Sequence, residues 1–318
     1  MSPGLRNRPF GREQERLAAK QKALRRRAGI IQSIRRFFIK NGYLEVETPH
    51  IIQAPAPESH IDAINTEAGF LHTSPELSMK RLISAGYSKI FQIGKCFRRD
   101  EKGRHHLPEF TLLEWYCCAE DYCHLMDRCE ELLLFVLEAE GIPGGPIAYQ
   151  GQEIDITGPW PRVTLEEAFR RYASVSMGEA IKAGQFDTIV VEEIEPALIS
   201  SRPVFLYDYP ASQASLARLK AKDPSLAERF ELYVGGLELA NGFSELTDVP
   251  EQRDRFLKEQ HQRQELGKTP YPMPEKFLEA LAHMPPCAGI ALGVDRLVML
   301  FSDKTSIDQV VTFTPEEV

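Results

Sequence analysis

FRRDEKGRHHLPEFTLLEWY, residues 97–116, is the stretch of this sequence that decides the fold. Apolar and polar residues alternate on both sides of a charged loop, which predicts two β-strands that meet at a hairpin. Successive side chains of a strand point to opposite faces. One face of the return strand therefore presents Phe110, Leu112, Glu114 and Tyr116. With Arg98 on the first strand, the pattern predicts a polar surface that is backed by an apolar one.

The side chains of this surface suit a nucleotide. Arginine binds phosphate through paired hydrogen bonds, and Arg98 stands where the first strand meets the loop. Phe110 offers an aromatic ring on which a flat base can stack. Arg296 follows a glycine-rich strand, where the backbone allows a ligand to approach closely. A lone arginine at a helix start is usually structural, but opposite Phe110 it can clamp a base by stacking.

A second hairpin is predicted around the turn Gly235–Gly236. With a two-residue turn, Tyr233 pairs with Glu238 and Glu231 pairs with Ala240, so the two glutamates become diagonal neighbours on one face. Two like charges placed there repel each other, and a hard divalent cation such as Mg²⁺ is a natural occupant. The alternative is an exposed carboxylate pair bound to lysines. Beside a phosphate-binding surface, the metal interpretation is the stronger one.

Glu245 lies farther along the same strand. Strict alternation places it on the face opposite Glu238, so a functional role requires a β-bulge, which we predict at Asn241–Gly242. With that bulge, Glu245 joins Glu114 in the pocket, and two carboxylates without metal-ligand spacing suit a substrate ammonium. A solvated acid at a strand end is the alternative.

The segment SPEL, residues 74–77, also has two interpretations. Ser74 can cap a helix whose first turn contains Glu76, because acidic side chains are favoured at helix N-termini. The same two side chains can instead bind a ligand. Their positions alone do not decide between these roles.

Composition restricts the class of protein. The chain has 318 residues, of which 43% are hydrophobic and 26% are charged, and a net charge of −8. No run approaches the roughly 20 apolar residues that a membrane-spanning helix needs. Its six cysteines lack the spacing of zinc ligands, which favours reduced thiols and a cytoplasmic location. A local basic cluster consists of Arg16, Lys20, Lys22 and Arg25–Arg27.

The remaining elements indicate an α+β fold with a mainly antiparallel sheet, because the strands meet through hairpins more often than through crossovers. We predict helices over 17–40, 76–85, 122–140 and 251–266, and further strands over 43–49, 203–210 and 288–293. Residues 142–200 are predicted to form a peripheral αβ insertion.

Three segments resemble the motifs of a known family. The helix and strand that end at Pro49, FRRDEKGRHHLPEF (97–110) and GIALGVDR (289–296) resemble, in order, motifs 1, 2 and 3 of class II aminoacyl-tRNA synthetases. The lysyl branch is indicated by RFELYVGGLELANGFSEL (229–246), SPELSMKRL (74–82) and PEFTLLEWY (108–116). The resemblance implies one catalytic domain over 16–318 after an N-terminal tail, 1–15.

The resemblance is narrower still. Too few residues precede the catalytic core for the OB-fold domain with which lysyl-tRNA synthetases bind the anticodon, so we expect no such domain and no anticodon-dependent tRNA binding. PASQASLA (210–217) and Ala291 are similar to the stand-alone bacterial ligases that attach lysine to elongation factor P. The tRNA enzymes typically have glycine at the position of Ala291. The added methyl is consistent with the preference of these ligases for (R)-β-lysine over α-lysine.

The resemblance also implies roles for individual residues. The catalytic arginines are Arg98 and Arg296. The residues that bind ATP are Arg98, Arg99, Asp100, Leu107, Phe110, Glu238, Leu239, Gly293 and Arg296. The residues that bind β-lysine or lysine are Ser74, Glu76, Glu114, Tyr116, Glu245 and Ala291. The Mg²⁺ ligands are Glu231 and Glu238. The family pattern Arg-x-Glu reads Arg98-Arg99-Asp100 here, one methylene shorter.

The implied activity is an ATP-dependent, AMP-forming ligase. It activates (R)-β-lysine as an adenylate and transfers it to the ε-amine of a lysine on elongation factor P. The resemblance also implies a homodimer that buries Ile30, Ile34 and the strand to Pro49. Two alternatives are a lysine-adenylating enzyme with another acceptor, such as tRNA or a free amine, and a non-catalytic paralogue.

Overall fold

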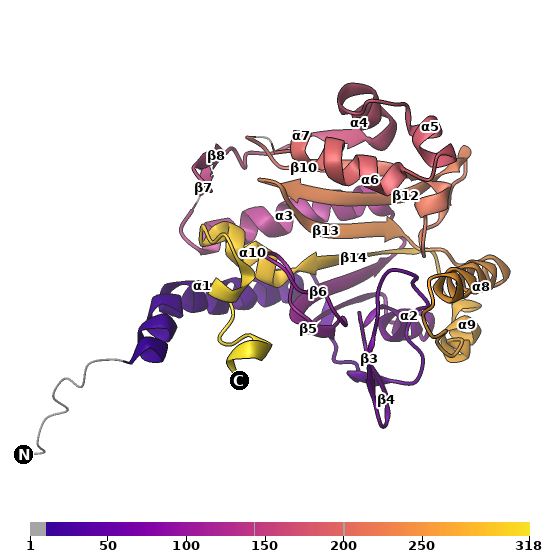
Figure 1. Cartoon of the computed structure of the whole chain (residues 1–318), viewed down its shortest axis with the longest axis horizontal. Coiled ribbons are helices and arrows are strands. Elements are labelled where there is room, and N and C mark those ends of the chain that lie inside the picture. The colour runs from indigo at the N-terminus through magenta and orange to yellow at the C-terminus, as the bar shows by residue number, and fades with distance from the viewer. Residues whose placement is uncertain (1–10, 143, 200) are drawn as a thin grey trace, which may run out of the picture.

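The computed structural model describes residues 11–142, 144–199 and 201–318 (Figure 1). Most of the predicted N-terminal tail, 1–15, therefore lies outside the described residues. Its last part does not form a tail, because helix α1 spans Arg12–Lys40 and begins five residues before the predicted start.

A nine-stranded sheet runs through the molecule in the order β1-β5-β6-β14-β13-β12-β10-β9, with β11 paired to β12. All pairs are antiparallel except β1 with β5 and β10 with β9. The predicted mainly antiparallel α+β fold is confirmed. In this order the strands are Leu44–Glu45, Lys89–Phe97, Glu109–Cys118, Cys287–Gly293, Leu237–Ser244, Asp223–Val234, Val204–Pro210 and Arg162–Thr164, and β11 is Leu219–Lys220.

Three helices cover one face of this sheet: α1, α3 (Tyr122–Ala139) and α10 (Val294–Phe301). The core lies between them and the sheet. Phe38 of α1 stacks on Phe91 of β5 with ring centroids 4.8 Å apart, and the ring of Trp115 on β6 lies 5.1 Å from Phe38. The predicted separation of β6 side chains onto two faces is confirmed. Leu113 and Trp115 face this core, while the alternate residues face the other side of the sheet.

A second group of helices packs together away from α1, α3 and α10. It consists of α2 (Glu76–Ser84), α8 (Val249–Glu265) and α9 (Glu275–Leu281), and α9 contacts both of the others. A three-stranded sheet lies below them in Figure 1 and contains β2 (Ile51–Ile52), β3 (Ile64–Thr66) and β4 (Gly69–Leu71). The predicted strand 43–49 is shorter than expected. Its backbone leaves the sheet after Glu45, and the Thr48 amide donates to the Gln92 side chain instead.

The predicted insertion, 142–200, contains a small hairpin, β7 (Ile147–Tyr149) with β8 (Gln152–Ile154), and then β9. After β9 come α4 (Leu165–Tyr172), α5 (Met177–Lys182), α6 (Phe186–Ile189), a π-helical turn and α7 (Glu195–Ala197). These helices pack on β10 and share a cluster of buried apolar side chains with it. Because β9 pairs with β10, the segment extends the central sheet at its far edge.

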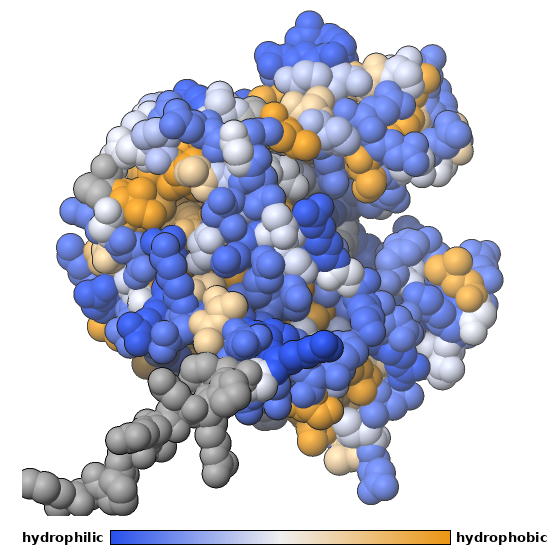
Figure 2. Space-filling model, turned by 60° about the vertical axis from the view of Figure 1, so that its left-hand side comes forward, coloured by the Kyte–Doolittle hydropathy of each residue, from blue (hydrophilic) through white to orange (hydrophobic). Residues whose placement is uncertain are grey.

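The surface is hollowed between the α4–α7 helices and the α8–α9 pair (Figure 2). In the part of the chain that the structure describes, no helix is both long and apolar enough to cross a membrane. All six cysteines are free thiols.

Candidate active site

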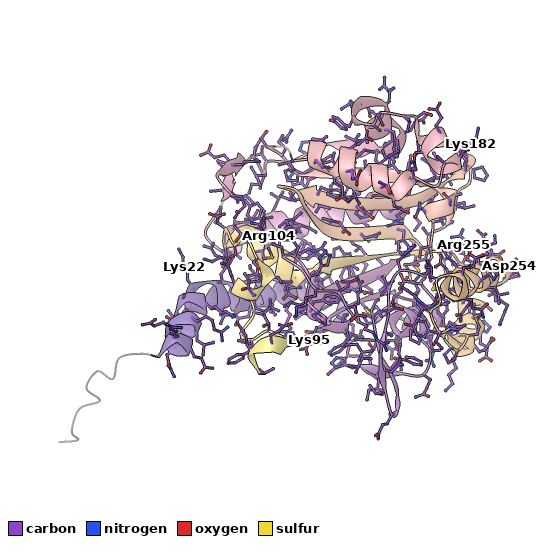
Figure 3. All side chains as sticks on the ribbon, in the orientation of Figure 1. Lys22, Lys95, Arg104, Lys182, Asp254 and Arg255 are labelled. Carbon is purple, nitrogen blue, oxygen red and sulfur yellow. The ribbon has the colours of Figure 1, made fainter. Side chains whose placement is uncertain are left out.

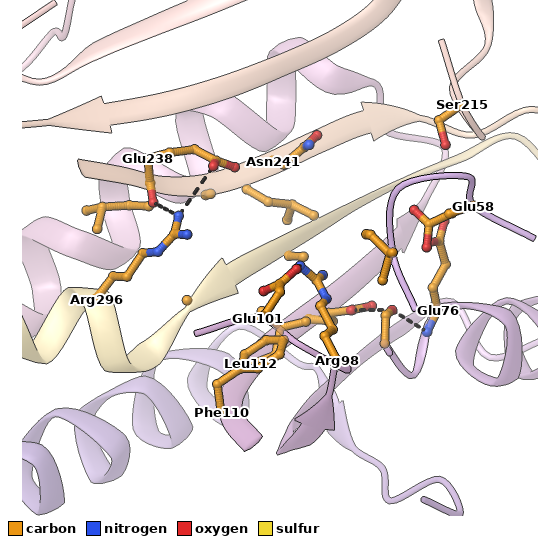
Figure 4. A pocket seen from close by; sticks show the side chains of 18 of the residues that line it. Glu58, Glu76, Arg98, Glu101, Phe110, Leu112, Ser215, Glu238, Asn241 and Arg296 are labelled. Carbon is orange, nitrogen blue, oxygen red and sulfur yellow. Dashed lines mark hydrogen bonds and ion pairs between the residues drawn. The ribbon is translucent and has the colours of Figure 1, made fainter. Parts of the chain in front are cut away.

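A cavity of about 390 Å³ opens on the sheet face opposite α1 and α3 (Figure 4). Its floor is formed by β6, β14 and β13, and its walls come from the loop 58–61, the loop 98–107 and the first turn of α10. Twelve of the residues predicted for the site line it: Ser74, Glu76, Arg98, Leu107, Phe110, Glu114, Tyr116, Glu238, Leu239, Ala291, Gly293 and Arg296.

Arg98 and Phe110 lie together at one end of the cavity. The Arg98 guanidinium carbon is 5.0 Å from the centre of the Phe110 ring. Its Nε lies 3.4 Å from the Thr73 carbonyl oxygen, and Nη1 lies 3.4 Å from a carboxylate oxygen of Glu101. These contacts are long for hydrogen bonds to a guanidinium, so Arg98 retains donors for an anionic ligand.

Two predicted nucleotide ligands, Arg99 and Asp100, do not line the cavity. The backbone of Asp100 adopts a left-handed conformation, with φ of 61°, at the point where the chain leaves β5. The Arg99 amide donates to the Asp62 carbonyl, which turns that residue toward the loop 58–62. The carboxylate that lines the cavity is the next one along the chain, Glu101.

Arg296 faces this region from the first turn of α10. Its Nη1 donates to the Glu238 carbonyl at 2.7 Å and lies 3.3 Å from the Glu238 carboxylate. Its Nη2 is 2.7 Å from Nε2 of His106 in the loop 98–107. Burial and the positive charge of Arg296 lower the pKa of His106, so this imidazole is held neutral and can accept from the guanidinium.

The second hairpin differs from its prediction in register. Gly235 and Gly236 form the expected turn with positive φ, and Tyr233 pairs with Glu238 as predicted. The predicted pairing of Glu231 with Ala240 is wrong, because Glu231 pairs with Asn241.

The difference is one extra residue on β13. Ala240 pairs with Leu232 and Glu238 with Tyr233, so Leu239 has no partner and forms the bulge. The bulge that Glu245 requires is therefore present, but at Leu239 and not at Asn241–Gly242. It shifts the alternation by one residue, so that Glu238, Asn241 and Glu245 share a face.

The two predicted metal ligands are electrostatic neighbours. Burial and the charge of Glu231 both raise the pKa of Glu238. Glu238 lines the cavity, whereas Glu231 lies behind it and accepts hydrogen bonds of 2.7 Å from Arg229 and from the Tyr233 hydroxyl. Among the described residues, no group of three or more His, Cys, Asp or Glu side chains is arranged to hold a metal. The pair fits a Mg²⁺ ion only if phosphate oxygens and water complete its coordination.

The other end of the cavity is acidic. Ser74 donates to one oxygen of Glu114 at 2.6 Å, and the Tyr116 hydroxyl donates to the other at 3.0 Å. The Ser74 hydroxyl oxygen also accepts from the Glu76 amide at 2.9 Å, so it binds the first amide of α2 as well as lining the pocket, although Pro75 is the N-cap residue of that helix. Burial and the nearby charge of Glu76 raise the pKa of Glu114 to about 8.

A buried lysine that the sequence did not single out completes this end. Lys80 is 1% exposed, and its Nζ lies 2.5 Å from carboxylate oxygens of both Glu76 and Glu245. The pKa of Lys80 is raised by the two carboxylates, while burial raises the pKa of Glu245 to about 8. The spacing of Glu76 and Lys80, four residues apart on a predicted helix, was the signal for this pair.

Glycine at position 289 allows the acidic side chains to meet. A Cβ there would lie 2.5 Å from Glu245 Oε1 and 2.2 Å from a ring carbon of Tyr116. By contrast, a Cβ at Gly293 would have no neighbour closer than 3.6 Å, so that glycine leaves open space on the cavity side.

Comparison with known proteins identifies the family. The model of class II tRNA synthetases (D, K and N) matches residues 13–317, almost the whole chain. The chain belongs to this family. Membership of the class II synthetases confirms the predicted fold family and implies that the chain uses ATP.

Several relatives of this class II synthetase share the name elongation factor P–(R)-β-lysine ligase. The protein from Hamiltonella defensa is 40% identical, over 92% of this chain and 95% of the relative. The protein from Proteus mirabilis is 41% identical, over 91% and 94%, and that from Vibrio cholerae is 40% identical, over 91% and 94%.

The synthetase pocket also contains residues that were not predicted as site residues. They come from elements outside the three motifs: Glu58, Gln213, Ser215, Arg229 and Glu259. Glu58 follows the Pro-rich loop IQAPAP, where neither helical nor strand periodicity indicates which side chains face inward. Only the folded path of that loop brings Glu58 to the cavity.

Proposed function

We propose that this chain is an ATP-dependent ligase that activates a lysine-type amino acid as its adenylate and transfers it to a lysine ε-amine of elongation factor P. The observation that carries the proposal is the division of one cavity into two ends. One end has the Phe110 ring beside Arg98, with Arg296 lining the same cavity, and the other is a buried acidic cluster. The name shared by the full-length relatives supports the same acceptor.

The nucleotide end is proposed to bind ATP. Phe110 stacks below the adenine and Arg296 covers it, while Arg98 binds the α-phosphate and the amino-acid carboxylate. Leu107 and Leu239 line the same space, and Gly293 leaves room for the ribose. Glu101 faces this end, so we assign it the acidic contact that was predicted for Asp100.

The acidic end is proposed to bind a substrate with two ammonium groups. Three carboxylates form this cluster: Glu76 and Glu245 are both paired with Lys80, and Glu114 accepts hydrogen bonds from Ser74 and Tyr116. When all three acids are ionised the cluster carries two uncompensated negative charges, because only one of them is neutralised by Lys80. A diamino acid such as lysine or β-lysine supplies two positive charges, which matches this deficit.

Ala291 is proposed to favour (R)-β-lysine. It pairs with Glu114 on one side and Asn241 on the other, so its methyl group lies on the cavity floor beside the acidic end. A methyl group there shortens the space for the substrate chain. Discrimination by one methyl group amounts to only about 1–3 kcal/mol.

The first half-reaction needs positioning and neutralisation of charge. The amino-acid carboxylate attacks the α-phosphorus in line, and pyrophosphate leaves. Arg98 neutralises the charge that accumulates on the α-phosphate, and Arg296, which is fixed by the Glu238 carbonyl, holds the nucleotide. Mg²⁺ held at Glu238 and Glu231 would neutralise phosphate charge.

The test is ATP–pyrophosphate exchange with (R)-β-lysine, α-lysine and no amino acid, followed by transfer to purified elongation factor P. We expect exchange that depends on a lysine, is fastest with the β-isomer, and yields a modified acceptor. Exchange without transfer to elongation factor P would favour another acceptor. The absence of exchange with either isomer would favour a non-catalytic paralogue, although both arginines and both metal carboxylates are present.

The same proposal includes a cytoplasmic homodimer with one catalytic domain over 16–318. The free thiols are consistent with a reducing compartment.

A further inference from the structure

Glu58 is a cavity-lining carboxylate without a partner. It stands in the loop between β2 and β3, on the same side of the cavity as Ser215 and Glu76 (Figure 4). In the part of the chain that the structure describes, its side chain makes no hydrogen bond or ion pair, whereas the nearby Glu76 and Glu114 are both engaged. A carboxylate left free in a pocket is available to a ligand.

The loop that carries Glu58 is held rigidly. Arg263 of α8 is 2% exposed and donates to the carbonyl oxygen of Glu58 at 2.6 Å and to that of Ile61 at 3.1 Å. The Ser59 amide donates to the Glu259 carboxylate at 2.7 Å, and Lys268 donates to the Ser59 carbonyl at 2.9 Å. These bonds fix the backbone on both sides of Glu58, so its carboxylate is positioned by the fold.

Glu58 lines the same cavity as Arg98. Arg98 is the charged group that acts on it most strongly, and Arg98 is the residue to which the proposal assigns the α-phosphate and the substrate carboxylate. Burial raises the pKa of Glu58 to about 7, partly offset by Arg98. The charged and titratable groups that face it are Arg98, Glu76 of α2, Glu259 of α8, Arg229 of β12 and, on its own loop, His60.

The transfer half-reaction requires such a group. A lysine ε-amine has a pKa of about 10.4 in water, so at neutral pH fewer than about one in a thousand is neutral and able to attack. The acidic end of the pocket favours the protonated form further. Glu114 and Glu245 lie at the end that holds the substrate ammonium, and the engaged Glu76 is paired with Lys80.

We propose that Glu58 is the general base that deprotonates the acceptor amine during transfer. This inference rests on the proposed function. Glu58 takes one proton from the acceptor ammonium, and the neutral nitrogen attacks the adenylate carbonyl carbon. As the new C–N bond forms and the bond between the carbonyl carbon and the phosphate oxygen breaks, the second proton leaves nitrogen with the AMP phosphate. Glu58 then returns its proton to water at the cavity mouth, so that atoms and charges balance.

The experiment compares Glu58→Gln with wild type in the two half-reactions separately. We expect ATP–pyrophosphate exchange to stay within threefold of wild type, while single-turnover transfer from the preformed adenylate falls 10²–10⁴-fold at pH 7, the usual contribution of a general base. Transfer by wild type should rise to a plateau near pH 7. Transfer by Glu58→Gln should instead rise about tenfold per pH unit to pH 9, because hydroxide and bulk buffer must then remove the proton.

Two further variants separate the base from a structural role. Glu58→Asp keeps a carboxylate and should recover at least a tenth of wild-type transfer. Glu67→Gln makes the same change on the exposed β3–β4 turn and should leave both half-reactions unchanged.

The outcomes are distinguishable. Loss of exchange in wild type contradicts the proposed function itself. Exchange intact in all proteins, with equal transfer by wild type and Glu58→Gln, overturns the general base. A raised KM for lysine in the exchange assay of Glu58→Gln also overturns it, because Glu58 would then bind the amino acid and not the acceptor.

Discussion

At the residue scale, the buried charge cluster of the acidic end is the feature that most determines what the pocket accepts. Lys80 pairs with both Glu76, in the first turn of α2, and Glu245, which directly follows β13. From strand alternation with a bulge for Glu114 and Glu245, and from the family resemblance for Glu76, the sequence predicted these three acids as one group. It did not predict Lys80, since a lysine within a helix is normally exposed.

Lys80→Met tests whether this cluster tunes substrate binding. Without the cation, the buried Glu245 carboxylate has no charged partner and takes up a proton. We expect the KM for lysine in ATP–pyrophosphate exchange to rise about 100-fold, roughly 2.7 kcal/mol, while the KM for ATP changes little. Lys95→Met, on an exposed surface ion pair, is the control. An unchanged KM for lysine together with a lower melting temperature would make Lys80 purely structural.

The raised pKa values of Glu114 and Glu245, both about 8, predict that ligand binding is linked to proton release. In the empty pocket at pH 7 these groups are mostly protonated. A bound ammonium favours their ionised forms, so their pKa values fall and protons leave. The affinity for lysine should therefore increase from pH 6 to 8 and level off above this range.

Calorimetry in buffers of different ionisation enthalpy measures this proton release. At pH 7 the apparent binding enthalpy should depend on the buffer, and Glu114→Gln should reduce the number of protons released. An enthalpy that is the same in every buffer would mean that both acids are already ionised in the empty pocket.

At the scale of elements, α1 is joined to the active site through a half-buried arginine. Arg27 forms an ion pair with Asp295 at the start of α10 and donates to Thr111 on β6 at 2.7 Å. Asp295 also accepts from the Thr111 amide at 2.7 Å. The basic cluster predicted on this helix therefore divides into two parts: Arg16, Lys20, Arg26 and Arg27 bind within the chain, whereas Lys22 points away from the body of the molecule (Figure 3).

Arg27→Met is expected to lower the free energy of unfolding by about 2–3 kcal/mol, because it leaves the buried Asp295 carboxylate without its cation. Urea denaturation measures the change, and Arg25→Met, in the exposed part of the same helix turn, should change stability by less than about 0.5 kcal/mol. Equal stability of the two variants would show that the Arg27 ion pair contributes nothing net.

Helices and hairpins were predictable to within a few residues because each has a strong period, a Gly-Gly turn or a cap. The exception, the bulge at Leu239, shows why register is harder to predict. To bring Glu238 and Glu245 onto one face, the strand needs one extra residue between them. A bulge at Leu239 and a bulge at Asn241–Gly242 both supply that residue, and the sequence of the strand by itself does not distinguish them. Only pairing with β12 decides between them, and that is a contact between strands.

At the scale of the whole molecule, the predicted dimer interface needs revision. Ile30 and Ile34 were expected to be buried between subunits, but both are fully buried within one chain, against the core under β5 and β6. The apolar side chains left exposed in the same region are Ile39 at 62%, Leu44 at 51% and Ile51 at 46%. They belong to the end of α1, to β1 and to β2, and β1 is an edge strand of the central sheet.

An edge strand with exposed apolar neighbours is a surface that proteins usually cover. A second copy of the chain that packs around this segment would remove these side chains from water, so we expect a dimer by light scattering at micromolar concentration. Leu44→Glu introduces a charge into the proposed interface and should give a monomer with the melting behaviour of a folded protein, because Leu44 contributes nothing to the core of its own chain. Leu257→Glu, on α8, where the leucine is 52% exposed and distant in sequence, is the control that should remain dimeric. A wild-type chain that stays monomeric at high concentration would contradict the dimer itself. A Leu44→Glu variant that stays dimeric would place the interface away from Ile39, Leu44 and Ile51, the apolar side chains most exposed in this part of the described chain.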